Sequence, residues 1–238
     1  MVAGCIIAGG VGARFGSSIP KQFFEVRGKP IIAYTMERFN ESPDIDCFDV
    51  VSLAGFTETV YDLAKRHGIG KLREVIPGGN SFGESVRNGV YGLKEACADD
   101  DIFVMHMAVA PLVSDDVIHD LVCVCKERGN AFSAVPSYMC MCEKTGEGFS
   151  EKYLDRESVY ALNTPQAVRY GKVLELYERA ALEGHDLEQR THLSTLMLDM
   201  KERIFFSKSS PINIKITTME DVELFRAFLH YKEMREVR

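Results

Sequence analysis

The chain has 238 residues, of which 46% are hydrophobic and 26% charged, an ordinary composition for a globular protein with ample material for a core. Its formal net charge of −7 argues against bulk attraction to nucleic acid or to an anionic membrane, so any bound anion must be held by local cations and backbone N–H groups. No apolar run approaches the roughly 20 residues of a membrane span, and the N-terminus lacks the pattern of a secretion signal, which together indicate a cytoplasmic protein.

Strand-like and helix-like segments alternate along the first 137 residues. The pattern predicts strands over 2–8, 47–54, 71–79, 99–111 and 130–137, and helices over 30–42, 57–68, 81–96 and 114–129. Thr57 and Ser114 are placed to cap the starts of their helices, and Gly68 is placed to end one. This alternation predicts an α/β fold with a doubly wound, mostly parallel sheet and helices on both faces.

The alternation breaks between about 137 and 160, where a Gly-rich turn, TGEG, separates two segments that could pair as a hairpin. Such a hairpin would leave the sheet as a protruding β-arm, and its apolar residues would need a surface to pack against. A second subunit is a natural candidate. We therefore expect a single domain, 1–238, that forms a homodimer through an arm at about 137–160.

The last part of the chain returns to regular patterns. Helices are predicted at about 170–184 and 190–200, and late strands at RIFFS (203–207) and INIKIT (212–217). A closing amphipathic helix is predicted over 218–234, where Thr218 stands three residues before Asp221 as a capping signal.

The cysteines and one histidine carry weaker functional information. The seven cysteines include two C-x-C pairs, Cys123/Cys125 and Cys140/Cys142, rather than the spacing of a zinc site, so reduced thiols are expected over a metal centre or disulfides. His106 lies within an apolar strand, where a hydrogen-bonded core histidine is expected rather than a catalyst.

The loop AGGVGARFG (8–16) follows the first strand, beyond the carboxyl end where ligands bind in open α/β sheets. Its glycines would let backbone N–H groups approach a phosphate, and Arg14 and Lys21 could neutralise phosphate charge. The glycine spacing misses the G-x-G-x-x-G dinucleotide pattern by one residue, and the Gly-Lys-Ser/Thr end of a Walker loop is absent. We interpret the loop as a triphosphate clamp; the alternative is a surface turn with two solvated cations.

Four motifs, IIAGGVGARFGSSIPKQF, PGGNSFGESV, LNTPQAV and NIKITTMEDVELF, occur in this order from about residue 4 to 228. Together they resemble the cytidylyltransferases that make CDP-activated sugar alcohols from methylerythritol phosphate, in isoprenoid synthesis, or from ribitol 5-phosphate, in teichoic acid synthesis. The resemblance implies a Rossmann-like nucleotidyltransferase fold. It also implies that the acceptor phosphate attacks the α-phosphorus of CTP and pyrophosphate leaves, with Mg²⁺ accompanying the triphosphate. In such transfers the protein supplies positioning and charge stabilisation rather than a covalent nucleophile.

The resemblance further implies roles for individual residues. Arg14 and Lys21 would hold the triphosphate and stabilise the transition state. Nucleotide contacts would come from Ala8, Gly9, Gly10, Gly12 and Ala108, and at the cytosine and ribose from Gly78, Gly79 and Ser85. Acceptor contacts would come from Asp155 and Arg156, which would reach the neighbouring subunit, and from Thr164, Thr191 and Lys215. Some of these have structural alternatives: Ser85 as an ordinary helix residue, Arg156 as a solvated arm residue, and Lys215 on a solvent face.

The sequence departs from the family pattern at several of these places. Met107 and Ala110 stand where the family has Asp and Arg, Phe82 where it has Arg, Met139 and Cys140 where it has Asp-Thr, and Thr191-His192 where it has Thr-Asp. A thioether is no ligand for Mg²⁺, so the metal ligand is left unassigned. Three hypotheses follow: an active cytidylyltransferase with a remodelled acceptor pocket, a catalytically impaired nucleotide-binding paralogue, or an assembly subunit. Within the first, AGG, PKQF and Val109 favour ribitol phosphate slightly.

Overall fold

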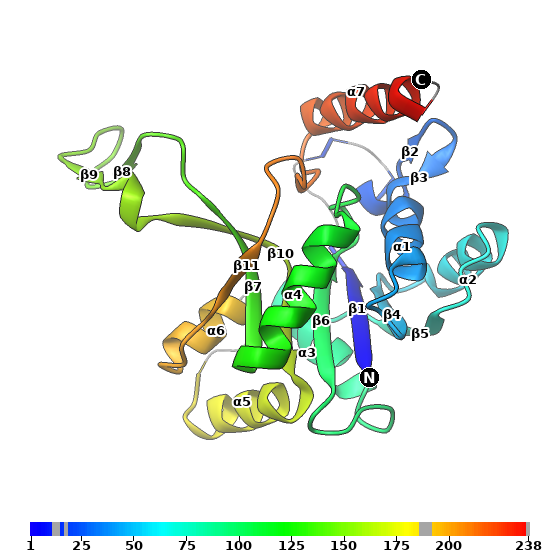
Figure 1. The fold of residues 1–238 in the computed structure, drawn as a ribbon, viewed down its shortest axis with the longest axis horizontal. Helices are drawn as coiled ribbons and strands as arrows, with labels where there is room; N and C mark the ends of the chain where they lie inside the picture. Colours follow the sequence, from blue (N-terminus) through cyan, green and yellow to red (C-terminus); the bar gives the residue numbers. More distant parts are fainter. Residues whose placement is uncertain (11–14, 17–18, 186–191, 237–238) are drawn as a thin grey trace.

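A central sheet of seven strands runs through the molecule in the order β11-β7-β10-β6-β1-β4-β5 (Figure 1). This computed structural model describes residues 1–10, 15–16, 19–185 and 192–236. The strands of the sheet are β1 (Val2–Ala8), β4 (Cys47–Ser52), β5 (Leu72–Pro77), β6 (Ile102–Met107), β7 (Asn130–Pro136), β10 (Tyr160–Arg169) and β11 (Phe206–Lys208). β10 is antiparallel to both of its neighbours, whereas the other neighbouring pairs are parallel.

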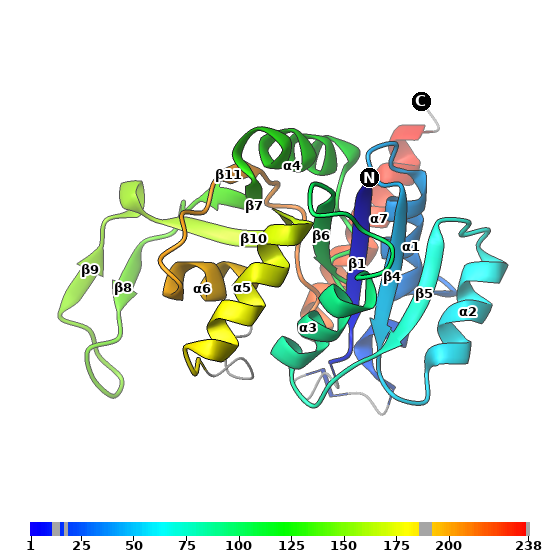
Figure 2. The same ribbon diagram turned by 90° about the horizontal axis from the view of Figure 1, so that it is seen from below.

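Helices cover both faces of the sheet, which confirms the predicted doubly wound α/β class. On one face lie α1 (Ile31–Glu41), α2 (Thr57–Arg66) and α4 (Asp115–Arg128); on the other lie α3 (Phe82–Gly92), α5 (Tyr170–Leu182) and α6 (Leu193–Asp199) (Figure 2). Because successive side chains of a strand point to opposite faces, Ile6 of β1 packs on the first group while Cys5 and Ile7 pack on the second. β1 is therefore buried along its whole length.

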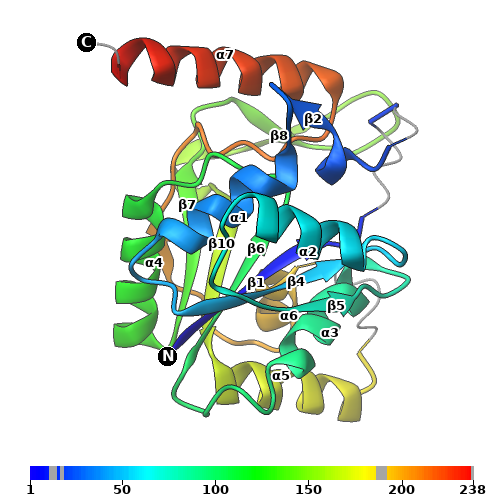
Figure 3. The same cartoon turned by 90° about the vertical axis from the view of Figure 1, so that its right-hand side faces the viewer.

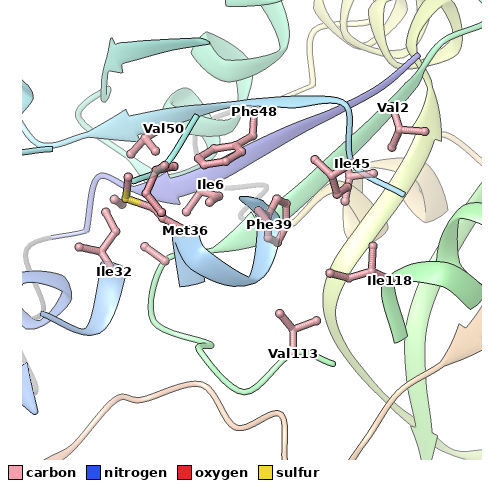
Figure 4. Packing of buried hydrophobic residues seen from close by; sticks show 14 of the residues in the cluster. Val2, Ile6, Ile32, Met36, Phe39, Ile45, Phe48, Val50, Val113 and Ile118 are labelled. Carbon is pink, nitrogen blue, oxygen red and sulfur yellow. The ribbon is translucent and has the colours of Figure 1, made fainter. Parts of the chain in front are cut away.

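Aromatic packing ties α1 to the sheet. Phe39 of α1 and Phe48 of β4 are both fully buried, with ring centroids 6.0 Å apart in an edge-on arrangement (Figure 4). A side chain at Gly4 would stand only 2.8 Å from the Phe39 ring. Glycine in the middle of β1 thus lets the helix approach the strand closely.

The C-terminal helix α7 (Met219–Glu236) lies across one end of the molecule, next to β2 (Glu25–Val26), which pairs with β3 (Lys29–Pro30) (Figure 3). Val222 and Phe225 are fully buried, and the Phe225 ring meets the Tyr34 ring edge-on at 5.1 Å. The predicted capping signal is confirmed on its acidic side, because the Asp221 carboxylate accepts hydrogen bonds from the backbone N–H groups of Thr217 and Thr218. Within the described ranges, no helix combines the length and apolar character needed to cross a membrane.

The predicted arm is present as a hairpin. β8 (Met141–Glu143) and β9 (Lys152–Leu154) pair antiparallel and project away from the sheet (Figure 1). Tyr138, Met139 and Tyr153 on it are each at least three-quarters exposed. In a single chain, the arm therefore leaves large apolar side chains exposed.

Several sequence predictions need correction. INIKIT is not a strand: it runs irregularly beside the turn after β6, and the Ile216 N–H donates to the Val109 carbonyl at 2.8 Å. The ten-residue β10 was not predicted at all, and the strand predicted at 203–207 is β11, which begins three residues later. Thr57 begins its helix and makes no side-chain cap, and the Ser114 side chain likewise makes none. Gly68 lies just beyond the C-cap with a φ of 64°, as a helix-ending glycine should.

Candidate functional site

A cavity of about 290 Å³ opens at the carboxyl ends of β1 and β6, where the sequence places the phosphate-binding loop. Its apolar lining comes from Ile7, Ala8, Phe82, Met107, Ala108 and Val109, and its polar lining from Gly10, Lys21, Gln22, Lys215 and Thr217. Of the residues predicted for the site, Ala8, Gly10, Lys21, Ala108 and Lys215 are brought together here. Arg14, Gly12 and Thr191 lie outside the described residues.

Two lysines from opposite ends of the chain meet at this cavity. Lys21 belongs to a short 3-10 turn, η1 (Lys21–Phe23), and its Nζ donates to the Ile216 carbonyl at 3.0 Å. Lys215 is the residue before that carbonyl, and Ile216 is itself tied to Val109 through its backbone N–H. Two lysine side chains therefore line one small space, an arrangement suited to a polyanion.

Gln22 fixes the backbone that follows β1, a role that the sequence reasoning missed. Its side chain is 1% exposed, and Nε2 donates to the carbonyls of Ala8 at 2.6 Å and Gly10 at 3.1 Å. With these carbonyls engaged, the loop backbone is held at the edge of the cavity. The only sequence signal was the position of Gln22 immediately after Lys21 in the PKQF motif.

The predicted cytosine and ribose residues form a tightly packed corner around Ser85. The Ser85 hydroxyl is buried, accepts from the Gly79 N–H at 3.1 Å and donates to the Ser81 carbonyl at 2.9 Å. A Cβ on Gly9 would stand 2.8 Å from this hydroxyl, and one on Gly78 would stand 3.0 Å from the Ser52 carbonyl. The Ser85 hydroxyl thus packs against the glycine backbones of two loops, and neither it nor Gly9, Gly78 and Gly79 is among the residues that line the cavity.

His106 and Thr164 form a buried pair. The His106 Nε2 lies 3.0 Å from the Ala110 carbonyl, so it carries the proton, and Nδ1 accepts from the Thr164 hydroxyl at 3.0 Å. Burial lowers the pKa of His106 to about 4, which keeps the ring neutral. His106 is the core histidine that the sequence predicted. The Thr164 hydroxyl is buried against it rather than among the residues that line the cavity.

The arm residues lie apart from this chain's own cavity. The Asp155 carboxylate accepts from the Glu157 N–H at 3.1 Å and caps the turn η2 (Arg156–Ser158). The Arg156 side chain is 64% exposed, and it borders a separate hollow at the base of the arm together with Tyr138 and Tyr160. An Arg in this place is available to another subunit, but within one chain it does not complete the site.

The residues described here do not provide a metal site. The lining holds no carboxylate among the described residues, and the Met107 thioether stands at the end of β6. Nor do any three His, Cys, Asp or Glu side chains in the described ranges cluster so as to hold a metal ion. Mg²⁺ prefers oxygen ligands and retains several waters, and the described lining residues offer it no carboxylate.

Comparison with known proteins gives a consistent result. The family model of 2-C-methyl-D-erythritol 4-phosphate cytidylyltransferase, IspD, matches residues 2–231. A ribitol-5-phosphate cytidylyltransferase of Lacticaseibacillus paracasei is 37% identical over 98% of this chain and 100% of its own length. A 2-C-methyl-D-erythritol 4-phosphate cytidylyltransferase of Clostridium botulinum is 31% identical over 92% of this chain and 93% of its own. The solved 4-diphosphocytidyl-2C-methyl-D-erythritol synthase of Anaerococcus prevotii has the same fold, with a TM-score of 0.80 at 21% identity over 96% of this chain and 98% of that one.

Proposed function

Because the chain belongs to the 2-C-methyl-D-erythritol 4-phosphate cytidylyltransferase (IspD) family, we propose that it transfers CMP from CTP to a polyol phosphate and releases pyrophosphate. The observation that carries the proposal is the meeting of Lys21 and Lys215 at one cavity, beside the backbone of Ala8 and Gly10. A triphosphate and an acceptor phosphate both need cations and N–H donors, and a net charge of −7 provides no general attraction for them.

The acceptor that we propose is ribitol 5-phosphate. The relative that matches at 37% identity over its full length carries this activity, and a second ribitol-5-phosphate cytidylyltransferase, of Streptococcus agalactiae, is 29% identical over 100% of this chain. Methylerythritol phosphate is the competing acceptor, since relatives at 31% identity act on it.

The chemistry needs no covalent intermediate on the protein. The acceptor phosphate oxygen attacks the α-phosphorus of CTP, the bond to the bridging oxygen breaks, and pyrophosphate departs with the electron pair. In our proposal Lys21, with Arg14, stabilises the charge that builds on the triphosphate, and Lys215 binds the acceptor phosphate. Such preorganised charge is the main catalytic contribution expected in phosphoryl-type transfers. Mg²⁺ remains our prediction as a companion of CTP, held by phosphate oxygens and water.

Initial rates of pyrophosphate release, with CTP and either acceptor, test the proposal. We expect wild-type kcat/KM to be higher with ribitol 5-phosphate than with methylerythritol phosphate. Lys215→Met should raise KM for the acceptor, whereas Lys65→Met, a change at an exposed lysine of α2, should leave both constants unaltered. Binding of CTP without any release of pyrophosphate would instead favour the impaired paralogue that Met107 and Ala110 suggest.

We also propose that the protein is a cytoplasmic homodimer that associates through the arm. The exposed Tyr138, Met139 and Tyr153 support an arm covered by a partner, and the seven free cysteines suit a reducing compartment. Light scattering should give twice the 26.7 kDa chain mass for the wild type. Tyr153→Ser should shift this towards the monomer, whereas Tyr61→Ser on α2, an exposed tyrosine far along the chain from the arm, should not.

A further inference from the structure

A histidine outside the predicted set stands beside the cavity. His192 precedes α6 as its N-cap residue, and its carbonyl accepts from the Leu196 N–H at 3.1 Å and from the Thr195 hydroxyl at 2.7 Å. Its backbone is thereby fixed by the first turn of the helix. The half-buried ring packs against Phe82, with centroids 5.4 Å apart and planes inclined at 52°. Phe82 begins α3 and lines the cavity, so two helices on the same face of the sheet bring the imidazole to its border.

The surroundings of this ring favour its neutral form. Burial lowers the pKa of His192, and the nearby positive charge of Lys215 lowers it further. Lys215 lines the same cavity as Phe82. A neutral imidazole carries one N–H donor and one nitrogen acceptor, which is the complement of an alcohol hydroxyl.

Neither ring nitrogen of His192 forms a hydrogen bond with the part of the protein that the structure describes. A half-buried polar group in this condition loses free energy unless water or a ligand satisfies it. The wall on which it sits is otherwise apolar, since Phe82, Met107 and Val109 offer no side-chain hydrogen bond. A hydroxylated ligand whose phosphate lies at Lys215 would find its hydrogen-bonding partner here in His192.

We propose that His192, held against Phe82, is a positioning residue that binds a hydroxyl of the acceptor polyol and so helps to select the acceptor. This inference rests on the proposed function. The bond aligns the chain of the polyol while the phosphate at its other end is presented to CTP. Because the contact is made to the acceptor and not to the nucleotide, its loss should raise KM for the acceptor alone.

The experiment compares His192→Ala and His192→Gln with the wild type, using ribitol 5-phosphate and a set of its analogues that each lack one hydroxyl. We expect His192→Ala to raise KM for ribitol 5-phosphate about tenfold and to leave KM for CTP within twofold. Gln, whose amide also donates and accepts, should recover most of the loss. One deoxy analogue should be a poorer acceptor for the wild type by a similar factor, while His192→Ala should no longer distinguish it from the parent acceptor.

The controls separate the possible failures. His119→Ala, at an exposed histidine of α4, should change neither KM, and thermal melting should show that each variant is folded. Equal effects of Ala and Gln, an equal rise in both KM values, or unchanged discrimination among the deoxy analogues would overturn the role of His192 while leaving the proposed transferase intact. Absence of CMP transfer by the wild type to every acceptor would overturn both.

Discussion

Gln22→Met should both destabilise the protein and weaken its affinity for CTP. Methionine has nearly the length of glutamine but no N–H group, so the change removes the two bonds to the Ala8 and Gly10 carbonyls without opening a cavity. Ala8 is 3% exposed, so its carbonyl would be left buried without this partner. An unsatisfied buried acceptor costs about 1–3 kcal/mol. We take about 2 kcal/mol, which corresponds to a fall in Tm of roughly 4–8 °C for a domain of this size.

The functional part of the effect follows from where these carbonyls lie. Ala8 and Gly10 border the cavity, so a loop that moves without its anchor misplaces the N–H groups offered to the triphosphate. We expect KM for CTP to rise by about tenfold or more. Differential scanning calorimetry and initial-rate kinetics would measure the two effects.

Gln166→Met is the matched control. Gln166 is also buried, at 3% exposure, and its Nε2 donates to the Asn163 carbonyl at 3.3 Å, within β10 and away from the cavity lining. This control should lower Tm without altering KM for CTP. If Gln22→Met changed neither quantity, or if both variants altered KM for CTP equally, the anchoring role of Gln22 would be refuted.

Three further predictions rest on single observations. Gly9→Ala places a Cβ 2.8 Å from the Ser85 hydroxyl, so calorimetry should show weaker CTP binding. The double variant Gly9→Ala/Ser85→Ala should lose less free energy of CTP binding than the sum of the losses in the two single variants. Lys21→Met should lower kcat/KM by about 10²–10³-fold, the loss typical of a preorganised charge at the transition state. The pKa of His106 is about 4 in the folded protein and about 6.5 when unfolded, so the unfolded state takes up the proton first as the pH falls. The free energy of unfolding should therefore decrease by up to about 3 kcal/mol between pH 6.5 and pH 4, and urea titrations of His106→Gln should show a smaller decrease.

The strands buried on both faces were predictable because their sequences are nearly continuous apolar runs. β1, β6 and β7 are of this kind, and each was located to within a few residues. β10 was missed because Asn163, Thr164 and Pro165 interrupt it, and proline in the middle of a run argues against a central strand. The structure accommodates them with a shift of register between Leu162 and Gln166. Such a shift depends on the neighbouring strand β7, which local sequence does not reveal.

The segment INIKIT was predicted to be a strand and is irregular in the structure. Its alternating isoleucines have the period of a strand, yet here the alternation separates a side chain buried in the core from one that lines the cavity. Ile216 is buried in the cluster beneath α7, and Lys215 between the isoleucines lines the cavity. Which face each side chain would take was predictable from the alternation. The partners of the Ile216 backbone were not predictable. Its N–H donates to the Val109 carbonyl and its carbonyl accepts from the Lys21 ammonium, and both residues are more than 100 positions distant.

In the site, as in the fold, features that depend on neighbouring residues in the sequence could be predicted, and features that depend on contacts with distant residues could not. The position of Lys21 at the cavity could be predicted because the loop that precedes it follows a buried strand, while its role as a phosphate ligand stays a prediction. The role of Gln22 could not be predicted. Its partners are backbone carbonyls, and because every residue has a carbonyl, the sequence does not indicate which ones Gln22 contacts. Ser85 was ambiguous in the sequence for a similar reason: its hydroxyl bonds to backbone groups four and six residues away, and only the fold places Gly9 against it.

Of the departures from the family pattern, Phe82 and Met107 line the cavity, whereas Ala110 is not among its lining residues and Met139 and Cys140 lie in the arm. The side proposed to bind phosphate is built from backbone groups that contact Gln22 and Ile216, together with the lysine at position 21. Phe82 and Met107, in contrast, stand at the first residue of α3 and the last residue of β6, where the side chain lines the cavity and the backbone is held by its own element. Exchange of a charged for an apolar side chain at such a position alters the wall of the cavity without removing the hydrogen bonds that Gln22 and Lys21 make. Under the proposed function, acceptor preference can therefore diverge among relatives while the binding of the triphosphate persists.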